Sequence, residues 1–270
     1  MSTHRTPFVE KYHQTVLNKG SMLCVNLDPA LPAQRRRFVM PNDDRVEFMR
    51  KIINDVAPHT SVIKMNRQYL VGLTIDQIRA LNILIHQKGM LSIVDHKLGD
   101  IDSSNESAIF WVKEERFDAF TFSPFGVNIE KASILAHEKS VGIIVIILMS
   151  HPEAIFHKIA IIDEKPLYLY IAEMCKKARV DGFWVGNAEH IDKSDISKIK
   201  QMIGDNSLAL VPLYGRDHTI IKSVIYHYSN AMINVGSAIT YADNPEEQAA
   251  HYKLLINNLK SEIETIKAQQ

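Results

Sequence analysis

The sequence Met90-Leu-Ser-Ile-Val-Asp-His-Lys-Leu-Gly-Asp-Ile101 carries charged residues at the end of an apolar run. Residues 91–94 predict a strand that is buried on both faces, as strands of parallel sheets are. In a regular strand the side chains of Asp95 and Lys97 leave the same face, because they stand two residues apart. Gly99 permits a tight bend after them. The pair has two interpretations at this point: an ion pair that caps a strand, or part of a functional site.

Length and composition limit the classes of protein that this chain can belong to. It has 270 residues, 46% of them hydrophobic, which suits one α/β barrel of roughly 250 residues or two smaller domains. The formal net charge is zero and no long basic run occurs, so we expect no nucleic-acid partner. The longest apolar run, residues 141–149, is much shorter than the ~20 residues of a membrane helix.

The cysteines and the N-terminus indicate a compartment. Cys24 and Cys175 form neither a disulfide framework nor a metal-type spacing, which suits a reducing environment. Residues 1–7 lack the apolar core of a signal peptide. We therefore expect a cytoplasmic protein that is not attached to a membrane.

Short apolar segments alternate with amphipathic segments eight times along the chain. Strands are predicted at residues 22–27, 61–65, 90–101, 117–123, 141–150, 182–185, 208–213 and 231–235. Helices are predicted at residues 43–57, 74–87, 103–115, 129–137, 166–178, 192–202, 217–228 and 245–267. This alternation predicts an α/β fold, a single-domain (β/α)8 TIM barrel that spans residues 1–270. Residues 1–20 are expected to form an N-terminal segment, with a helix at 8–18, that covers the bottom of the barrel.

The barrel gives the charged strand ends a common location. Asp28 ends the first predicted strand, and Lys64 lies near the end of the second. Asp95 and Lys97 end the third, and active sites of this fold lie at the carboxyl ends of the strands. Charges from three neighbouring strands favour a catalytic or ligand-binding role over an accidental ion pair. The fifth and seventh strands contribute two more residues to the same rim, Ser150 and Pro212.

The segment Asp95-His96-Lys97-Leu98-Gly99-Asp100-Ile101 resembles the Asp-x-Lys-x-x-Asp signature of the orotidine 5'-monophosphate decarboxylase family. Segments at 27–29, 121–126, 148–152 and 235–245 are similar to family segments in the corresponding places, so the resemblance covers most of the chain. The signature also occurs in sugar-phosphate decarboxylases and aldolase-like synthases of the same superfamily. Lys64 on the second strand, together with the length, favours the pyrimidine enzyme.

The resemblance implies a carboxy-lyase that converts orotidine 5'-monophosphate to uridine 5'-monophosphate in pyrimidine biosynthesis without a metal or cofactor. Its catalytic charge network would be Lys64, Asp95, Lys97 and Asp100. Loss of CO2 from C6 of the orotate ring leaves a carbanion that the ring cannot delocalise, so fixed charges must stabilise it. Lys97 would stabilise the carbanion and protonate it, while Asp95 would disfavour the substrate carboxylate. His96 is predicted to face the helices instead.

The resemblance also implies how substrate binds and how subunits pair. Asp28 and Lys64 would bind the ribose, and Ser150 would hydrogen-bond the pyrimidine. Asp100 and Ile101 would reach into the site of the neighbouring subunit, so the enzyme would be a homodimer. Ser104 stands where the family usually has a threonine that contacts ribose across this interface.

The phosphate site is where the sequence departs from the family. The family has Val-Gly-Arg after the eighth strand, with the arginine holding the phosphate, whereas this chain has Val235-Gly236-Ser237. Gly236 and Ser237 can still offer N–H groups. Arg216 either supplies the missing charge from the loop after the seventh strand or is a surface arginine that pairs with Asp217 or another carboxylate. Two alternative functions follow: a barrel that has lost activity and binds a nucleotide or partner, or a related sugar-phosphate decarboxylase.

Overall fold

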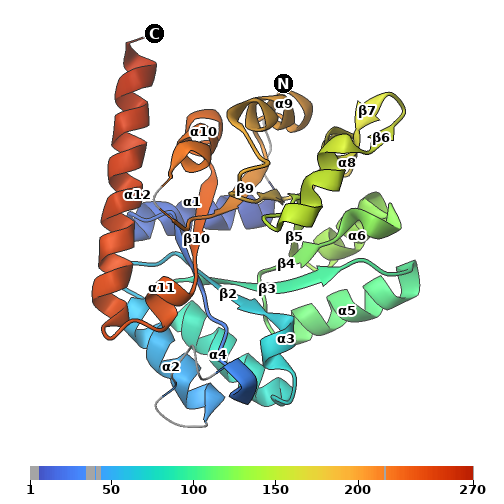
Figure 1. The fold of residues 1–270 in the computed structure, drawn as a ribbon. Helices are drawn as coiled ribbons and strands as arrows, with labels where there is room; N and C mark the ends of the chain where they lie inside the picture. Colours follow the sequence, from blue (N-terminus) through green and yellow to red (C-terminus); the bar gives the residue numbers. More distant parts are fainter. Residues whose placement is uncertain (1–5, 35–39, 41–43, 216, 270) are drawn as a thin grey trace.

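The computed structural model describes residues 6–34, 40, 44–215 and 217–269. Across these residues eight parallel strands close into a barrel in which β1 pairs with both β2 and β10. The strands are β1 (Leu23–Asn26), β2 (Val62–Asn66), β3 (Leu91–Leu98), β4 (Ala119–Phe122), β5 (Gly142–Leu148), β8 (Gly182–Val185), β9 (Leu208–Pro212) and β10 (Ala231–Val235). The predicted (β/α)8 barrel is therefore confirmed, and each predicted strand has its counterpart (Figure 1).

Helices in the connections after the strands surround the barrel, and α1 precedes β1 (Figure 1). They are α1 (Pro7–Lys19), α2 (Arg45–Val56), α3 (Arg67–Leu70), α4 (Ile75–Gln87), α5 (Asp102–Glu114), α6 (Ile129–Glu138), α7 (Phe156–Ile159), α8 (Leu167–Lys177), α9 (Lys193–Ile203), α10 (Thr219–His227), α11 (Ser237–Thr240) and α12 (Pro245–Ala268). The first residues of several helices follow from local chemistry. Thr74 and Asp192 begin α4 and α9 through capping boxes, and Pro245 occupies the first turn of α12, where its missing N–H costs little.

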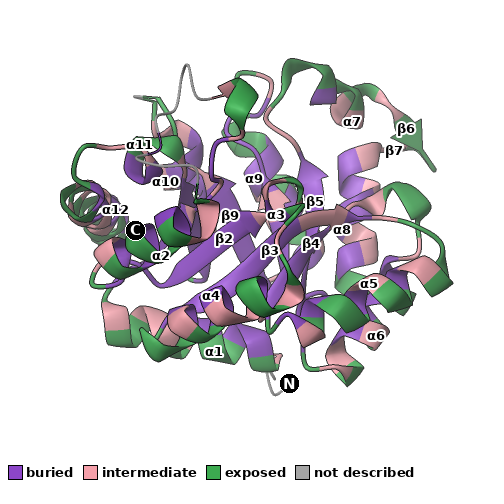
Figure 2. Cartoon of the chain, turned by 90° about the horizontal axis from the view of Figure 1, so that it is seen from below, coloured by how far each residue is buried: buried purple, intermediate pink, exposed green. Residues whose placement is uncertain are grey.

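Buried side chains fill both the barrel interior and the layer between barrel and helices. Figure 2 shows buried strands in the centre and helices whose outer faces are exposed. At the amino ends of the strands α1 packs across the barrel so closely that a Cβ atom on Gly142 would lie only 2.5 Å from the Phe8 ring. The Tyr12 hydroxyl donates a hydrogen bond of 2.6 Å to the carbonyl oxygen of Ala231, the first residue of β10. Within the described residues no helix is both long and apolar enough to cross a membrane.

Alternation along the strands directs one set of side chains into the barrel. Near its middle this set is apolar and includes Cys24, Val62, Ile93, Ala119, Ile144, Leu210 and Met232. Two residues further along, the same face carries what we call the mouth layer: Asn26, Lys64, Asp95, Thr121, Ile146, Trp184, Pro212 and Asn234. The barrel is thus apolar below and largely polar at the carboxyl ends of its strands, where a site is expected.

The segment between β5 and α8 has structure that the sequence did not predict. A 3-10 turn (Pro152–Ile155) leads to α7, and a short antiparallel hairpin follows, β6 (Ile161–Ile162) and β7 (Lys165–Pro166). Asp163 and Glu164 form its two-residue turn with φ values of 48° and 62°, which suits a turn with left-handed central residues. This segment adds a cover beside the mouth of the barrel.

Candidate active site

Two charged side chains of the mouth layer, Lys64 and Asp95, form one ion-paired cluster with Lys97. Asp95 accepts a hydrogen bond of 2.8 Å from Lys64 Nζ on one carboxylate oxygen and one of 2.7 Å from Lys97 Nζ on the other. The side chains of Lys64 and Asp95 are only 2% and 3% exposed, and that of Lys97 is 35% exposed. Buried charges are costly unless they are paired and hydrogen-bonded, so each member of this cluster depends on the others to remain buried and charged.

The cluster keeps its buried members ionised. Burial penalises the charged form of Asp95, but Lys64 and Lys97 outweigh it and hold the pKa of this carboxyl well below its usual range. Burial also works against the ammonium of Lys64, yet Asp95 and then Asp28 raise the pKa of Lys64 above its ordinary value. Two lysines against one aspartate leave the cluster with a net positive charge, which favours an anionic ligand.

Lys97 lies in a β-bulge of β3. Val94 pairs with Phe120 and Leu98 with Phe122, so the stretch of β3 between them has two residues more than the facing stretch of β4. Lys97 takes the left-handed conformation with φ of 53°, which is unusual for a residue with a side chain. The expectation of a regular strand is therefore wrong here: the two side chains do meet, but Lys97 lies in a bulge.

Gly99 is needed for a reason other than the one predicted. Its φ is not positive, so a left-handed bend does not require it. A Cβ atom at this position would lie 2.8 Å from the carbonyl oxygen of Ser123 and 3.0 Å from its Cβ. The Ser123 N–H also donates to Leu98 O at 2.6 Å. Gly99 thus permits β3 and the end of β4 to approach closely.

Trp184 of β8 faces the two lysines from across the mouth. Its indole ring lies 5.0 Å from Lys64 Nζ and 5.4 Å from Lys97 Nζ, within the range of a cation–π interaction. In the strand register Trp184 stands beside Ile146 of β5 and Leu210 of β9. The mouth therefore has a charged side on β2 and β3 and an apolar side on β5 and β8, an arrangement that suits a flat ligand with one charged edge.

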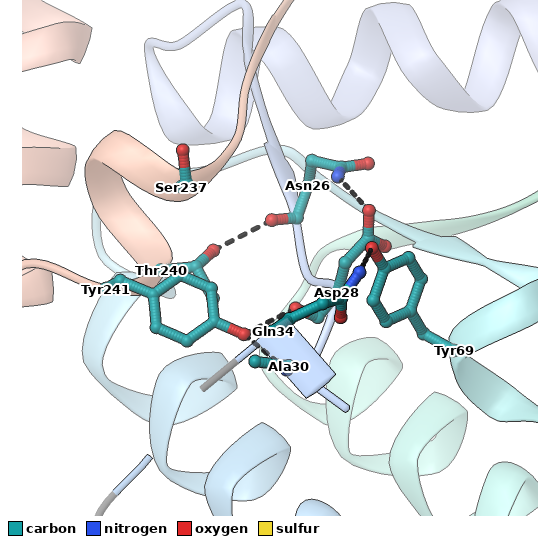
Figure 3. A pocket seen from close by; sticks show the side chains of 8 residues that line it. All are labelled: Asn26, Asp28, Ala30, Gln34, Tyr69, Ser237, Thr240 and Tyr241. Atoms are coloured by element: carbon teal, nitrogen blue, oxygen red, sulfur yellow. Dashed lines mark hydrogen bonds between the residues drawn. The ribbon is translucent and has the colours of Figure 1, made fainter. Parts of the chain in front are cut away.

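Asp28 lies at the edge of the mouth, where β1 ends. Its carboxylate accepts hydrogen bonds from the Asn26 side chain and, at 3.0 Å, from the backbone N–H of Asn66. Tyr241 donates a hydrogen bond of 2.7 Å to Asp28 O, which connects this corner to the segment after β10. A cavity of about 210 Å³ opens here and is lined by Asn26, Asp28, Ala30, Gln34, Tyr69, Ser237, Thr240 and Tyr241 (Figure 3). Among these eight lining residues Asp28 is the charged one.

Other predicted residues also lie on this rim. Ser150 follows β5 and packs so closely on Gly186 that a Cβ there would lie 2.7 Å from the Ser150 N and Oγ atoms. Pro212 is the half-buried last residue of β9, and Gly236 and the exposed Ser237 follow β10. Arg216, the candidate replacement for the family arginine, lies outside the described residues.

Three predicted residues make no hydrogen bond or ion pair with the cluster of their own chain, as far as the structure describes it. Asp100 is exposed, and its carboxylate accepts a hydrogen bond of 2.7 Å from the Ile101 N–H. Ile101 is 69% exposed, and Ser104 is half-buried on α5. Ser104 shares a separate cavity with His96, which as predicted lies among helix residues. Lys64, Asp95 and Lys97 are thus ion-paired within one chain, whereas Asp100 forms no ion pair with them in the described part of that chain.

The family model described as "Orotidine 5'-phosphate decarboxylase / HUMPS family" matches residues 21–252. The chain belongs to this family. It is similar to the orotidine 5'-phosphate decarboxylase of Cupriavidus metallidurans, with 28% identity over 258 residues, 90% of this chain and 92% of the relative. The counterpart of Thermomicrobium roseum is 25% identical over 277 residues, 97% of this chain and 96% of the relative. The family resemblance predicted from residues 95–101 is thus confirmed.

Solved structures of decarboxylases in this family share the fold. Leishmania donovani OMP decarboxylase superposes with a TM-score of 0.74 at 20% identity, covering 94% of this chain and 98% of the other. The orotidine 5'-monophosphate decarboxylase of Methanocaldococcus jannaschii, complexed with the inhibitor BMP, gives a TM-score of 0.68 at 22% identity, covering 87% and 98%.

Two residues of the mouth were not assigned a role from the sequence. Thr121 contacts both Asp95 and Lys97, and Trp184 faces both lysines. Each left a weak signal, because a polar residue in the apolar β4 strand and a large ring at the end of β8 are conspicuous. Their partners could not be identified without the strand order and register.

Proposed function

We propose that this chain decarboxylates orotidine 5'-monophosphate to uridine 5'-monophosphate in pyrimidine nucleotide biosynthesis, in the cytoplasm and without a metal or cofactor. The observation that carries the proposal is the buried Lys64–Asp95–Lys97 cluster at the carboxyl ends of the strands, in a chain of this family. The names of the relatives support the choice of substrate, since they too are decarboxylases of this nucleotide.

The chemistry proceeds through fixed charges. The bond between C6 and the carboxylate breaks, CO2 departs, and the electron pair stays on C6. Lys97 stabilises that pair as an ammonium and then donates its proton to C6, and its amine regains a proton from water. Asp95 carries its charge where the substrate carboxylate binds, so it disfavours the substrate more than the transition state, from which the negative charge is leaving.

Residues around the mouth bind the rest of the nucleotide. Asp28 and Lys64 hold the ribose, which agrees with the Asp28 carboxylate facing the cavity of Figure 3. Ser150 hydrogen-bonds the pyrimidine, whose ring has room between the charged and apolar sides of the mouth. Pro212, Gly236 and Ser237 line the phosphate end, where Arg216 supplies the positive charge.

The active form is a homodimer in which a second copy completes the site. Asp100 and Ile101 of one chain approach Lys97 of the other, with Ser104 close to the ribose. Two observations support this. Asp100, among the described residues, forms no ion pair with a lysine of its own chain. Exposed apolar side chains also lie near it. Ile101 follows it in the chain and is 69% exposed, and Phe125, 90% exposed, precedes Gly126, at which a Cβ atom would lie 3.5 Å from Asp100 O.

Ser237 favours one alternative function. The cavity that it lines is bordered, among described residues, by neutral side chains and Asp28, which does not suit a phosphate dianion. A barrel homologue that has lost activity and binds a ligand without a phosphate, or a partner, would share this feature.

The test is direct. Purified protein is incubated with orotidine 5'-monophosphate, and the absorbance change of the pyrimidine is followed together with CO2 release. Turnover that Lys97→Ala abolishes supports the proposal. No turnover by a folded dimer, at protein concentrations comparable to substrate, would refute it and favour the alternative.

A further inference from the structure

The bulge in β3 leaves a backbone group that the strand ladder does not satisfy. Leu91 N–H donates to Ser61 O beside β2, so in a regular strand the odd-numbered residues of β3, Lys97 among them, would direct their N–H groups toward β2. The register shift between Val94 and Leu98 turns the Lys97 N–H toward β4 instead. Lys97 N–H donates there to the side-chain oxygen of Thr121, at 2.9 Å. Thr121 is fully buried, so on its side the bond is shielded from water.

The same hydroxyl also holds the catalytic carboxylate. Thr121 Oγ1 lies 2.8 Å from the Asp95 oxygen that accepts from Lys97 Nζ. Ionised Asp95 can only accept hydrogen bonds, so the hydroxyl proton must point to Asp95. The hydroxyl lone pairs are then free to accept from Lys97 N–H. One hydroxyl thus joins the backbone of Lys97 to the side chain of Asp95, with its proton in a determined position.

We infer that Thr121 is a positioning residue for the decarboxylation proposed above, because its hydroxyl holds the bulged, left-handed Lys97 in register with Asp95. The backbone of Lys97, which positions its ammonium, has a φ of 53°, a conformation that persists only where surrounding contacts enforce it. Thr121 supplies that enforcement from β4. Without its hydroxyl the Lys97 segment can relax and carry the ammonium away from the reacting carbon.

Variants can separate the hydroxyl from the size of the side chain. Thr121→Val keeps the shape and loses the hydroxyl, whereas Thr121→Ser keeps the hydroxyl and loses a methyl group. Thr60→Val is the matched control, since Thr60 is equally buried, lies before β2 at the other end of the barrel, and its hydroxyl has no hydrogen-bond partner among the described residues. Thr121→Ala is the second hydroxyl-free variant if the valine proves insoluble.

Two measurements carry the test. In Thr121→Val we expect kcat to fall about 10- to 100-fold with KM changed less than about threefold, since misplacing a catalytic group by about 1 Å costs roughly that much. Hydrogen exchange of the Lys97 amide should become about tenfold faster or more. Thr121→Ser and Thr60→Val should stay within about threefold of the wild type in both measurements.

The inference is overturned if the Lys97 amide stays protected in Thr121→Val, or if kcat there equals that of the wild type. It is also overturned if Thr121→Ser loses as much as Thr121→Val, because side-chain size would then be what matters. The exchange measurement needs no turnover. If the wild-type protein is inactive on orotidine 5'-monophosphate, the proposed function is refuted. Amide exchange then still decides whether Thr121 holds Lys97.

Discussion

Replacing Asp95 with asparagine keeps the shape of the side chain and removes the charge that two lysines share. Lys64 then remains 2% exposed with its main partner gone. Removing one member of a buried ion pair costs about 3–5 kcal/mol, because the other charge stays buried. The asparagine oxygen can still accept one hydrogen bond and Asp28 still favours the Lys64 ammonium. We therefore expect Asp95→Asn to lower the free energy of unfolding by the lower end of this range, about 3 kcal/mol. For a chain of this size that corresponds to a decrease in Tm of about 6–12 °C.

The pKa values of Asp95 and Lys64 also predict how the stability of each protein changes with pH. In the wild type the lowered pKa of Asp95 contributes stability above pH ~4 that is lost as the pH falls further. The raised pKa of Lys64 contributes stability below pH ~10 that is lost as the pH rises through the folded-state value. Between pH ~4 and pH ~10 the ion pair makes the free energy of unfolding neither rise nor fall with pH. In Asp95→Asn burial should lower the pKa of Lys64 below its unfolded value, so the variant should gain stability as the pH rises.

Thermal unfolding of both proteins at pH 6, 7.5 and 9 tests this expectation. The difference in Tm should be largest at pH 6 and shrink toward pH 9. Asp102→Asn, which breaks the exposed pair with Lys131, is the control and should match the wild type. If Asp95→Asn loses less than about 1 kcal/mol of stability relative to the wild type, or if this loss grows with pH, the buried charges are not coupled as described.

Further predictions concern catalysis and binding. Lys97→Ala should leave the circular dichroism spectrum unchanged and lower kcat by roughly 10⁴-fold or more, and near-normal activity would exclude Lys97 as the proton donor. Mixing inactive Lys97→Ala with inactive Asp100→Ala under subunit exchange should restore activity, since one site of each mixed dimer is then intact; no recovery with heterodimers present would place Asp100 in its own subunit's site. Arg216→Ala should raise KM for the nucleotide strongly while hardly changing residual turnover of orotidine, whereas equal losses on both would remove Arg216 from the phosphate site, and Ser237→Arg would then test whether the family residue improves binding. Binding of uridine 5'-monophosphate should change the fluorescence of Trp184, and a change of undiminished size in Trp184→Phe, where Trp111 remains, would show that the Trp184 ring does not face the ligand.

The sequence by itself determined the fold and the location of the site. Eight apolar segments separated by amphipathic ones can bury their faces only as parallel strands with crossover helices, so the barrel follows from the pattern. Lys64 and Asp95 could be assigned to one mouth because carboxyl ends of parallel strands lie on the same side of the barrel. Strand bounds needed only short-range information, and the predicted ends differ from those observed by a few residues.

Only the tertiary structure decided how the site is held together. The left-handed conformation of Lys97 and the need for Gly99 depend on β4, from which Thr121 and Ser123 approach β3. Trp184 is distant in sequence from both lysines, and only closure of the barrel places its ring opposite them. A register shift within one strand pair leaves no periodic trace in the sequence, because it arises from contacts between strands and not from the order of residues along either one.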